Sequence, residues 1–176
     1  FRANPPFASI LYSKIIPSSG GDTLWSCLSS VFEALPKEIK SYLENLNAVH
    51  DMGDFRNTFV NNEPIGSADK LNEGFKKFGS SIHPIVKTHP VTKKKFIYVN
   101  PGFTNHIVGL NATDSNNLLN YLFTLMNKPE FQIRFKWTEN TIAMWDNRCT
   151  MHYAIADYIP QYRKMHRITV LNDKRV

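Results

Sequence analysis

Three residues near the end of the chain have types and spacing that could bind anions and a metal ion. His152 lies upstream of Arg163 and Arg167, and the two arginines are four residues apart. If both arginines lie on one strand, the alternation of side chains puts them on the same face, so two planar guanidinium groups point into one volume. Such a pair suits a dicarboxylate or a sulfonate, and a neutral imidazole beside it could bind a metal. The alternative is a hydrogen-bonded structural histidine beside two solvated arginines.

The strand expected to carry these arginines, at residues 165–171, does not show from its pattern which face is buried. Odd positions carry Arg163, Met165, Arg167, Thr169 and Leu171, whereas even positions carry Lys164, His166, Ile168 and Val170. Neither face is purely apolar. A polar pocket inside a barrel would give this mixture, and so would an edge strand.

The other elements that must position these residues are mostly strands. Runs rich in β-branched and aromatic residues, or alternating in polarity, predict strands at residues 8–16, 85–88, 96–100, 131–137 and 141–145. Apolar spacing predicts a helix capped by Asp22 or Thr23 and ended by Pro36, a short second helix, and a third helix capped by Asp114 or Ser115. Residues 51–80 lack a period and are typical either of a lid or of a loop anchored by its aromatic residues.

Length and composition favour one globular domain over residues 1–176. Hydrophobic residues make up 42% of the chain and charged residues 20%, and no apolar run approaches the length of a membrane span. Cys27 and Cys149 form no CxxC pair, and the first residues do not look like a signal peptide. We therefore expect a cytoplasmic protein that does not bind a membrane.

The net charge of +6 raises nucleic acid as a partner, but the positive charges are weakly clustered. The densest group, Lys93 to Lys95, precedes an apolar run and is typical of the solvated tip of a hairpin. No nucleic-acid module signature, phosphate loop, dinucleotide fingerprint or serine-hydrolase elbow occurs. These observations argue against nucleic-acid binding, nucleotide chemistry and serine-hydrolase chemistry.

Four segments together resemble the taurine dioxygenase family, which includes 2,4-D dioxygenases. They are Gly20-Gly21-Asp22-Thr23-Leu24-Trp25, Tyr98-Val99-Asn100-Pro101-Gly102-Phe103-Thr104, Lys128-Pro129-Glu130, and the run from Trp145-Asp146-Asn147-Arg148 through His152 to Arg167. The resemblance covers nearly the whole chain in the right order. It implies dependence on Fe(II) and 2-oxoglutarate, and a mainly β fold with flanking helices around a double-stranded β-helix, or jelly-roll, core that holds the metal at one open end.

The resemblance also implies roles for particular residues. His152 matches the distal histidine of the iron triad, and Arg163 matches the arginine that binds the far carboxylate of 2-oxoglutarate. Thr23 matches the hydroxyl that assists Arg163, and Arg167 matches the arginine near the C1 carboxylate and the anionic head group of the substrate. The pocket-lining positions of the family match Phe103 and, more loosely, Thr58 and Phe59.

The other two iron ligands of the family form a His-x-Asp pair a few residues before a Phe or Tyr that aligns with Phe1. The sequence therefore contains one ligand of three, and we expect a domain that is incomplete at its N-terminal side. Either a preceding segment supplies the pair, or the chain is a truncated relative that cannot hold iron with useful affinity. The remaining histidines form no such pair and are interpreted as structural or surface residues: His50, His83, His89 and His106.

With the ligands complete, the resemblance implies an enzyme that hydroxylates a small anionic substrate with O2. It favours an aliphatic sulfonate such as taurine, with release of sulfite, an aldehyde, succinate and CO2. Sulfate esters and aryloxyacetates are the alternatives within the family, and an anion-binding β-helix domain without catalysis is the alternative outside it. The sequence leaves open whether the protein forms a homo-oligomer.

Overall fold

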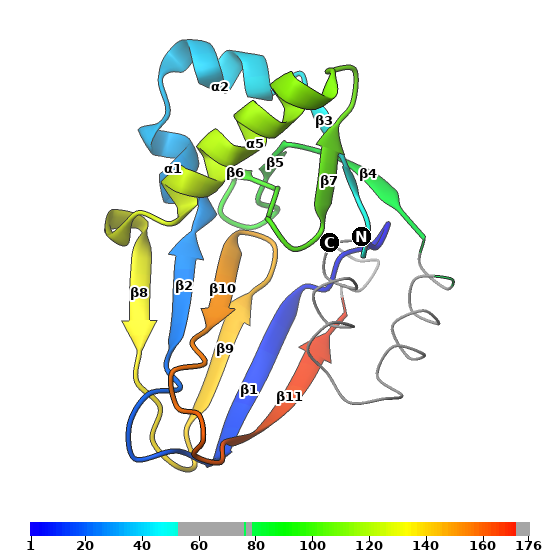
Figure 1. Cartoon of the computed structure of the whole chain (residues 1–176). Helices are drawn as coiled ribbons and strands as arrows, with labels where there is room; N and C mark the ends of the chain where they lie inside the picture. Colours follow the sequence, from blue (N-terminus) through cyan, green and yellow to red (C-terminus); the bar gives the residue numbers. More distant parts are fainter. Residues whose placement is uncertain (53–75, 77–78, 172–176) are drawn as a thin grey trace.

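The computed structural model describes residues 1–52, 76 and 79–171, and two three-stranded antiparallel sheets lie below the helices in the view of Figure 1. Sheet A has the order β11 (Lys164–Val170), β1 (Ala8–Ile15) and β9 (Ile142–Asp146). Sheet B has the order β10 (Thr150–Ala154), β2 (Thr23–Cys27) and β8 (Gln132–Phe135). Since strands distant in sequence are neighbours in both sheets, residues from the two ends of the chain meet in one place.

Three tryptophans join the inner faces of the two sheets. Trp25 on β2 lies 5.3 Å from Trp145 on β9 and 6.3 Å from Trp137, measured between ring centroids. Leu11 on β1 and Met165 on β11 pack against the same cluster. Odd positions of β1 and β11 therefore face inward, which answers the question that the sequence pattern left open for the final strand.

The prediction of a helix that begins at Asp22 or Thr23 is wrong over the first turn of that helix. Residues 23–27 form β2, the central strand of sheet B, and α1 (Leu28–Ala34) begins only afterwards. β2 pairs with β10 on one side and β8 on the other, so pairing with distant strands overrides the local helical spacing. As a result Thr23 is fixed in a sheet and does not cap a helix.

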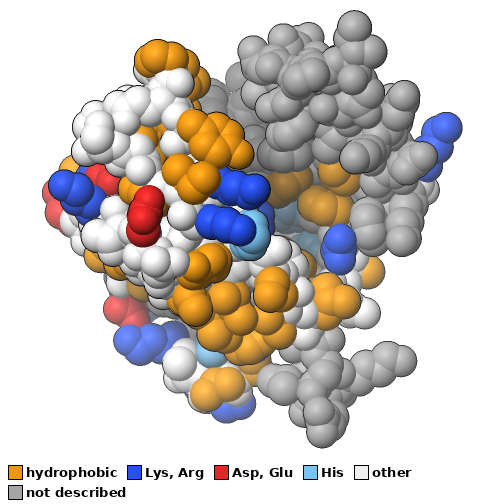
Figure 2. Space-filling view, turned by 90° about the horizontal axis from the view of Figure 1, so that it is seen from below, with side chains coloured by type: hydrophobic (Ala, Val, Ile, Leu, Met, Phe, Trp, Pro, Cys, Tyr) orange, Lys and Arg blue, Asp and Glu red, His pale blue; other side chains and the backbone are white. Residues whose placement is uncertain are grey.

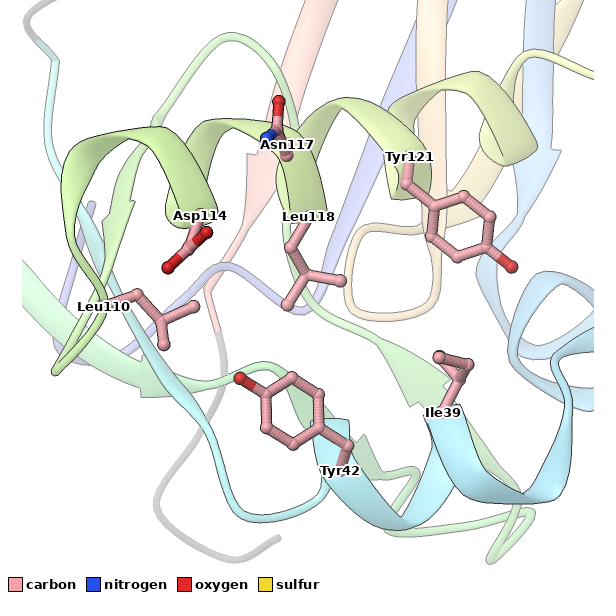
Figure 3. Close-up of a pocket in the computed structure, with 7 residues that line it drawn as sticks. All are labelled: Ile39, Tyr42, Leu110, Asp114, Asn117, Leu118 and Tyr121. Carbon is pink, nitrogen blue, oxygen red and sulfur yellow. The ribbon is translucent and has the colours of Figure 1, made fainter.

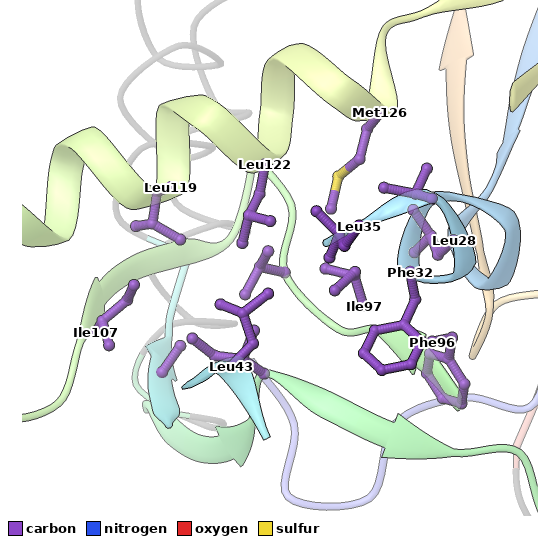
Figure 4. Close-up of a cluster of buried hydrophobic side chains, with 14 residues drawn as sticks. Leu28, Phe32, Leu35, Leu43, Phe96, Ile97, Ile107, Leu119, Leu122 and Met126 are labelled. Carbon is purple, nitrogen blue, oxygen red and sulfur yellow. The ribbon is translucent and has the colours of Figure 1, made fainter. Parts of the chain in front are cut away.

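The rest of the described chain builds a second core against three helices (Figure 4). These helices are α1, α2 (Lys37–Leu43) and α5 (Ala112–Met126). They pack with a sheet of order β4 (Ser81–Pro84), β3 (Asn47–His50) and β7 (Thr104–Ile107), and with the hairpin of β5 (Val86–Thr88) and β6 (Lys95–Ile97). The hairpin confirms the predicted solvated turn at Lys93 to Lys95.

The predicted third helix is confirmed, but its cap is not. The side chain of Asn111 caps α5 by accepting a hydrogen bond from the Asp114 amide at 2.9 Å, so the helix begins before Asp114 and Ser115. Ser115 instead accepts a hydrogen bond from the Ile107 amide and ties the helix to β7.

The sequence patterns did not predict four of the strands, which are β3, β4, β7 and β10. A 3-10 turn, Pro129–Phe131, precedes β8. Most of the loop interpreted as a lid or an anchored connection lies outside the described residues.

The outer face of sheet A presents apolar side chains to solvent. Ile10 lies opposite Met144 on one neighbouring strand and Ile168 on the other, and both of these are more than half exposed. In the view from below, hydrophobic side chains gather over a broad area of the surface (Figure 2). Over the described part of the chain, every helix is too short or too polar to traverse a bilayer.

Candidate active site

Arg163 lies one residue before β11 and has buried hydrogen-bond donors without acceptors. Its Nε and Nη2 atoms are shielded from solvent and have no partner among the described residues. The guanidinium carbon lies 5.8 Å from the ring centroid of Tyr158. A buried guanidinium with free donors is costly unless an anion satisfies it, so this geometry fits a carboxylate.

The loop before β2 makes room for the Arg163 side chain, because Gly21 has no side chain of its own. Gly21 has a φ of +72°, and a Cβ at this position would lie 3.0 Å from Cδ and 3.1 Å from Nε of Arg163. The Gly21 amide donates a hydrogen bond of 2.8 Å to Asp157, which fastens this loop to the segment that leads to Arg163. Glycine is required here both by its backbone conformation and by the close approach of the arginine.

Thr23 follows on β2, and its hydroxyl is almost completely buried. The indole N–H of Trp137 donates to Thr23 Oγ1 at 3.0 Å. Because the indole can only donate, it occupies a lone pair of the hydroxyl and leaves the hydroxyl proton to be donated to a ligand. This arrangement fits the assisting role that the sequence resemblance assigned to Thr23.

His152 lies on β10 directly opposite Trp25, with its ring 5.0 Å from that of Trp145. Part of its surface is open to solvent, yet burial lowers the pKa of His152 to about 4, and the positive charge of Arg167 lowers it further. The imidazole is therefore neutral at neutral pH, which is the form that binds a metal ion. Thr23 lies opposite Ala154, two residues from His152, so the side chains of Thr23 and His152 share the inner face of sheet B.

Arg167 projects from β11 on the inner face of sheet A. Its guanidinium carbon lies 6.0 Å from the ring centroid of Trp145, and its Nη2 donates to Ser9 Oγ at 2.9 Å. Burial lowers the pKa of Arg167, which nevertheless stays charged at any physiological pH. Trp145 is thus in contact range of both His152 and Arg167, and it joins the imidazole of one sheet to the cation of the other.

The predicted pocket-lining residues are placed only in part. Phe103 follows Asn100 in the turn before β7, and its ring lies 4.9 Å from that of Phe1. Phe103 therefore forms an aromatic pair with Phe1, which joins the segment before β7 to the first residue of the sequence. Thr58 and Phe59 lie outside the described residues.

His152 belongs to no group of three potential metal ligands among the residues that the structure places. The group that does occur there is His89, Asp146 and Cys149. Arg148 already donates to both carboxylate oxygens of Asp146, at 2.6 to 3.1 Å. His89 accepts the amides of Val91 and Thr92 at Nδ1, so its Nε2 carries the proton and donates to Asp146 at 3.0 Å. This group is a structural ion-pair network, as expected for His89.

An open pocket between α2 and α5 contains none of the predicted site residues (Figure 3). Its lining is mainly apolar, from residues such as Ile39, Leu110 and Leu118. The carboxylate on its wall, Asp114, is bound by the Asn111 side chain at the start of α5. The pocket lies on the surface of the second core and is separate from the predicted site residues.

Several residues that shape the site were not predicted as functional. They are Ser9, Gly21, Trp137, Trp145 and Asp157. The Gly20-Gly21 pair was a usable signal, because paired glycines predict positive φ and a close approach of another chain segment. Trp137 gave no such signal, since an alternating strand predicts a buried ring but not its hydrogen-bond partner.

Two facing antiparallel sheets, with Arg167 and His152 on their inner faces and Arg163 just before β11, define a double-stranded β-helix protein. A family model described as "Taurine catabolism dioxygenase TauD, TfdA family" matches residues 1–169. The chain belongs to this family, which confirms the resemblance inferred from its motifs.

Relatives and solved structures agree with this assignment. An alkylsulfatase of Acinetobacter baylyi is 37% identical over 96% of this chain and 53% of that protein, and an alpha-ketoglutarate-dependent sulfonate dioxygenase of Saccharomyces cerevisiae is 35% identical over 96% and 40%. The structure of a taurine dioxygenase from Burkholderia xenovorans is similar with a TM-score of 0.80 at 34% identity, over 98% of this chain and 54% of that chain. The likeness confirms the predicted fold. The chain spans about half the length of the curated relatives it matches.

Proposed function

We propose that the protein is an Fe(II)- and 2-oxoglutarate-dependent dioxygenase acting on a small anionic organic substrate. The observation that carries this proposal is the Arg163 guanidinium, which has two buried donors and no acceptor among the described residues. A carboxylate accepts both donors of such a fork in parallel. One solved relative, AAD-2, was determined in complex with Mn(II) and N-oxalylglycine, at 28% identity and a TM-score of 0.83 over 97% of this chain and 65% of that chain.

Four residues of this chain would bind 2-oxoglutarate, Fe(II) and the substrate. Arg163 and the Thr23 hydroxyl would hold the far carboxylate of 2-oxoglutarate, because both present unused donors. His152 would supply one neutral ligand to Fe(II), and Arg167 would hold the C1 carboxylate and the anionic head group of the substrate. When bound, the iron and 2-oxoglutarate supply the oxidising power that hydroxylates the substrate as 2-oxoglutarate becomes succinate and CO2. We infer that Fe(II) would need ligands besides His152, because His152 belongs to no group of three potential ligands among the described residues.

Within this class we favour an aliphatic sulfonate such as taurine as the substrate. The guanidinium of Arg167 suits a sulfonate, and relatives in Saccharomyces cerevisiae and Schizosaccharomyces pombe carry sulfonate dioxygenase names. Hydroxylation of the carbon beside sulfur would give a hydroxysulfonate that breaks down to sulfite and an aldehyde. Sulfate esters are the second candidate, because relatives at 32% and 37% identity are named for sulfate-ester chemistry. We place the enzyme in the cytoplasm.

The competing function is an anion-binding domain without catalysis. It is favoured by one observation, that His152 stands without two further ligands among the described residues. Both functions predict anion binding by Arg163 and Arg167, but only the oxygenase predicts metal-dependent turnover.

One experiment on the full-length gene product separates the two functions. Succinate formation is measured with Fe(II), 2-oxoglutarate, O2 and a panel of sulfonates, sulfate esters and aryloxyacetates. We expect substrate-dependent succinate, with sulfite released from sulfonates, and loss of both in His152→Ala. In Arg163→Ala we expect weaker binding of 2-oxoglutarate with metal binding kept. Activity that survives in His152→Ala would refute the metal assignment, and absence of turnover with every substrate would leave the anion-binding function.

A further inference from the structure

We infer that Ser9 and Asn147 are positioning residues that fix the Arg167 guanidinium for the anionic head group of the substrate. This inference rests on the proposed function, in which Arg167 binds that head group. It adds a relay of two neutral side chains behind the arginine. The relay joins β1 and the turn after β9 to β11.

Ser9 is fully buried on β1 and accepts a hydrogen bond of 2.9 Å from Arg167 Nη2. In the sheet register it lies between Thr169 on β11 and Trp145 on β9. Since Leu11, two residues further along β1, packs in the tryptophan cluster, Ser9 is also on the inner face. A buried serine with this contact limits the orientations that Arg167 can adopt.

Asn147 fixes the hydroxyl of Ser9 from the other side. Ser9 Oγ lies 3.2 Å from Asn147 Oδ1 and 3.0 Å from Nδ2, so the serine hydroxyl is bonded whichever way the amide is turned. The backbone amide of Asn147 donates to the carbonyl of Phe7 at 2.9 Å, which holds the turn against the start of β1. The serine oxygen is therefore a fixed acceptor for Arg167.

The neutrality of this relay is important for anion binding. No carboxylate forms an ion pair with Arg167 within the described ranges 1–52 and 79–171. An aspartate in place of Ser9 would orient the guanidinium but would neutralise it and compete with the substrate. A serine orients the group and leaves its full positive charge available.

The relay also sets the position of the charge relative to the metal ligand. Arg167 and His152 both lie against the Trp145 ring, at 6.0 Å and 5.0 Å. A bound sulfonate is thereby held at a defined place relative to His152, and the carbon presented for oxidation depends on that place. Ser9 and Asn147 thus contribute to specificity without touching the substrate.

The test measures binding of a short alkanesulfonate to the full-length gene product, loaded with Fe(II) and saturating 2-oxoglutarate under argon. Calorimetry gives the affinity, and tryptophan fluorescence gives a second readout because Trp145 is close to Arg167. We expect Ser9→Ala to weaken binding by about threefold to tenfold, the cost of ordering one long side chain. Asn147→Ala should produce a smaller loss in the same direction.

Ser13→Ala is the matched control. Ser13 lies on the same strand and face and is equally buried, but its hydroxyl bonds the carbonyls of Thr138 and Thr141 instead of an arginine. It should lower thermal stability without changing sulfonate affinity. If Ser9→Ala and Asn147→Ala bind sulfonate as tightly as the wild type while Arg167→Ala does not, the relay is refuted and the role of Arg167 stands. If the wild type binds no sulfonate, or Arg167→Ala binds equally well, the role of Arg167 fails and the relay fails with it.

Discussion

At the scale of single residues, Gly21 controls the space available to Arg163. In Gly21→Ala the new Cβ would meet Cδ and Nε of the arginine at 3.0 and 3.1 Å, and a positive φ adds strain of about 1–2 kcal/mol. We expect 2-oxoglutarate affinity to fall about tenfold or more, because the arginine must leave the orientation that presents its donors. Gly109→Ala is the control, since Gly109 has a φ of +84° and no atom within 4 Å of its Cβ position. Equal affinities in the two variants would contradict a role for the contact.

Thr23 supports a second prediction at the same scale. Thr23→Val keeps the shape of the side chain but removes the acceptor of the Trp137 indole, which costs about 1–3 kcal/mol when a buried donor loses its partner. It also removes the hydroxyl proton offered to 2-oxoglutarate. We expect both a lower melting temperature and weaker 2-oxoglutarate binding, measured by calorimetry. Thr104→Val is the control for stability alone, because buried Thr104 bonds Asn100 and His50 in the second core. Unchanged cosubstrate affinity in Thr23→Val would refute its assisting role.

At the scale of elements, α5 can be weakened without touching the site. Asn111→Ala removes the side-chain cap of the helix and should lower stability by about 1 kcal/mol. α5 packs through Leu119, Leu122 and Met126 in the second core, so we expect unchanged 2-oxoglutarate affinity. Thermal unfolding and calorimetry check the two expectations. Thr124→Ala, at an exposed position in the same helix, is the control and should leave the melting temperature unchanged. A change in 2-oxoglutarate affinity in Asn111→Ala would contradict the prediction and show that the two cores are coupled.

The elements that could be predicted are those whose local pattern agrees with their pairing. β1 and α5 have strong strand and helix patterns, and both are present. β2 could not be predicted, because Leu24 and Leu28 have helical spacing and only the partners β8 and β10 make residues 23–27 a strand. The inward face of β11 depends in the same way on its pairing with β1. Local pattern is a weak guide wherever long-range pairing decides the conformation.

The candidate site likewise has residues that the sequence could predict and contacts that it could not. Motif resemblance named His152, Thr23, Arg163 and Arg167, and the structure gives each an environment suited to its proposed role. The contacts that hold them could not be named, since Trp137 to Thr23 and Ser9 to Arg167 each join residues more than 100 positions apart. Such contacts depend on the strand order of the sheets.

At the scale of the whole molecule, buried histidines make stability depend on pH. His50 is 2% exposed, and burial lowers the pKa of His50 to about 3, with further lowering by the positive charges of His83 and Lys87. The folded state therefore binds fewer protons than the unfolded state between the ordinary histidine pKa of 6.5 and about pH 3. In this window stability rises with pH and is lost as the pH falls. His152 acts in the same direction, because its pKa is also lowered.

We expect this linkage at His50 alone to remove about 2 kcal/mol of folding free energy between pH 7 and pH 5, where the unfolded state takes up a proton that the folded state excludes. His50→Asn keeps an uncharged polar group that can bond Thr104, and it should flatten the decline in denaturant unfolding measured at each pH. His106→Asn, at an exposed position on β7, should leave the slope unchanged. A slope that is equally steep in His50→Asn and in the wild type would assign the acid sensitivity to other groups. His152 and His83 would then be tested next, because burial also lowers the pKa of each.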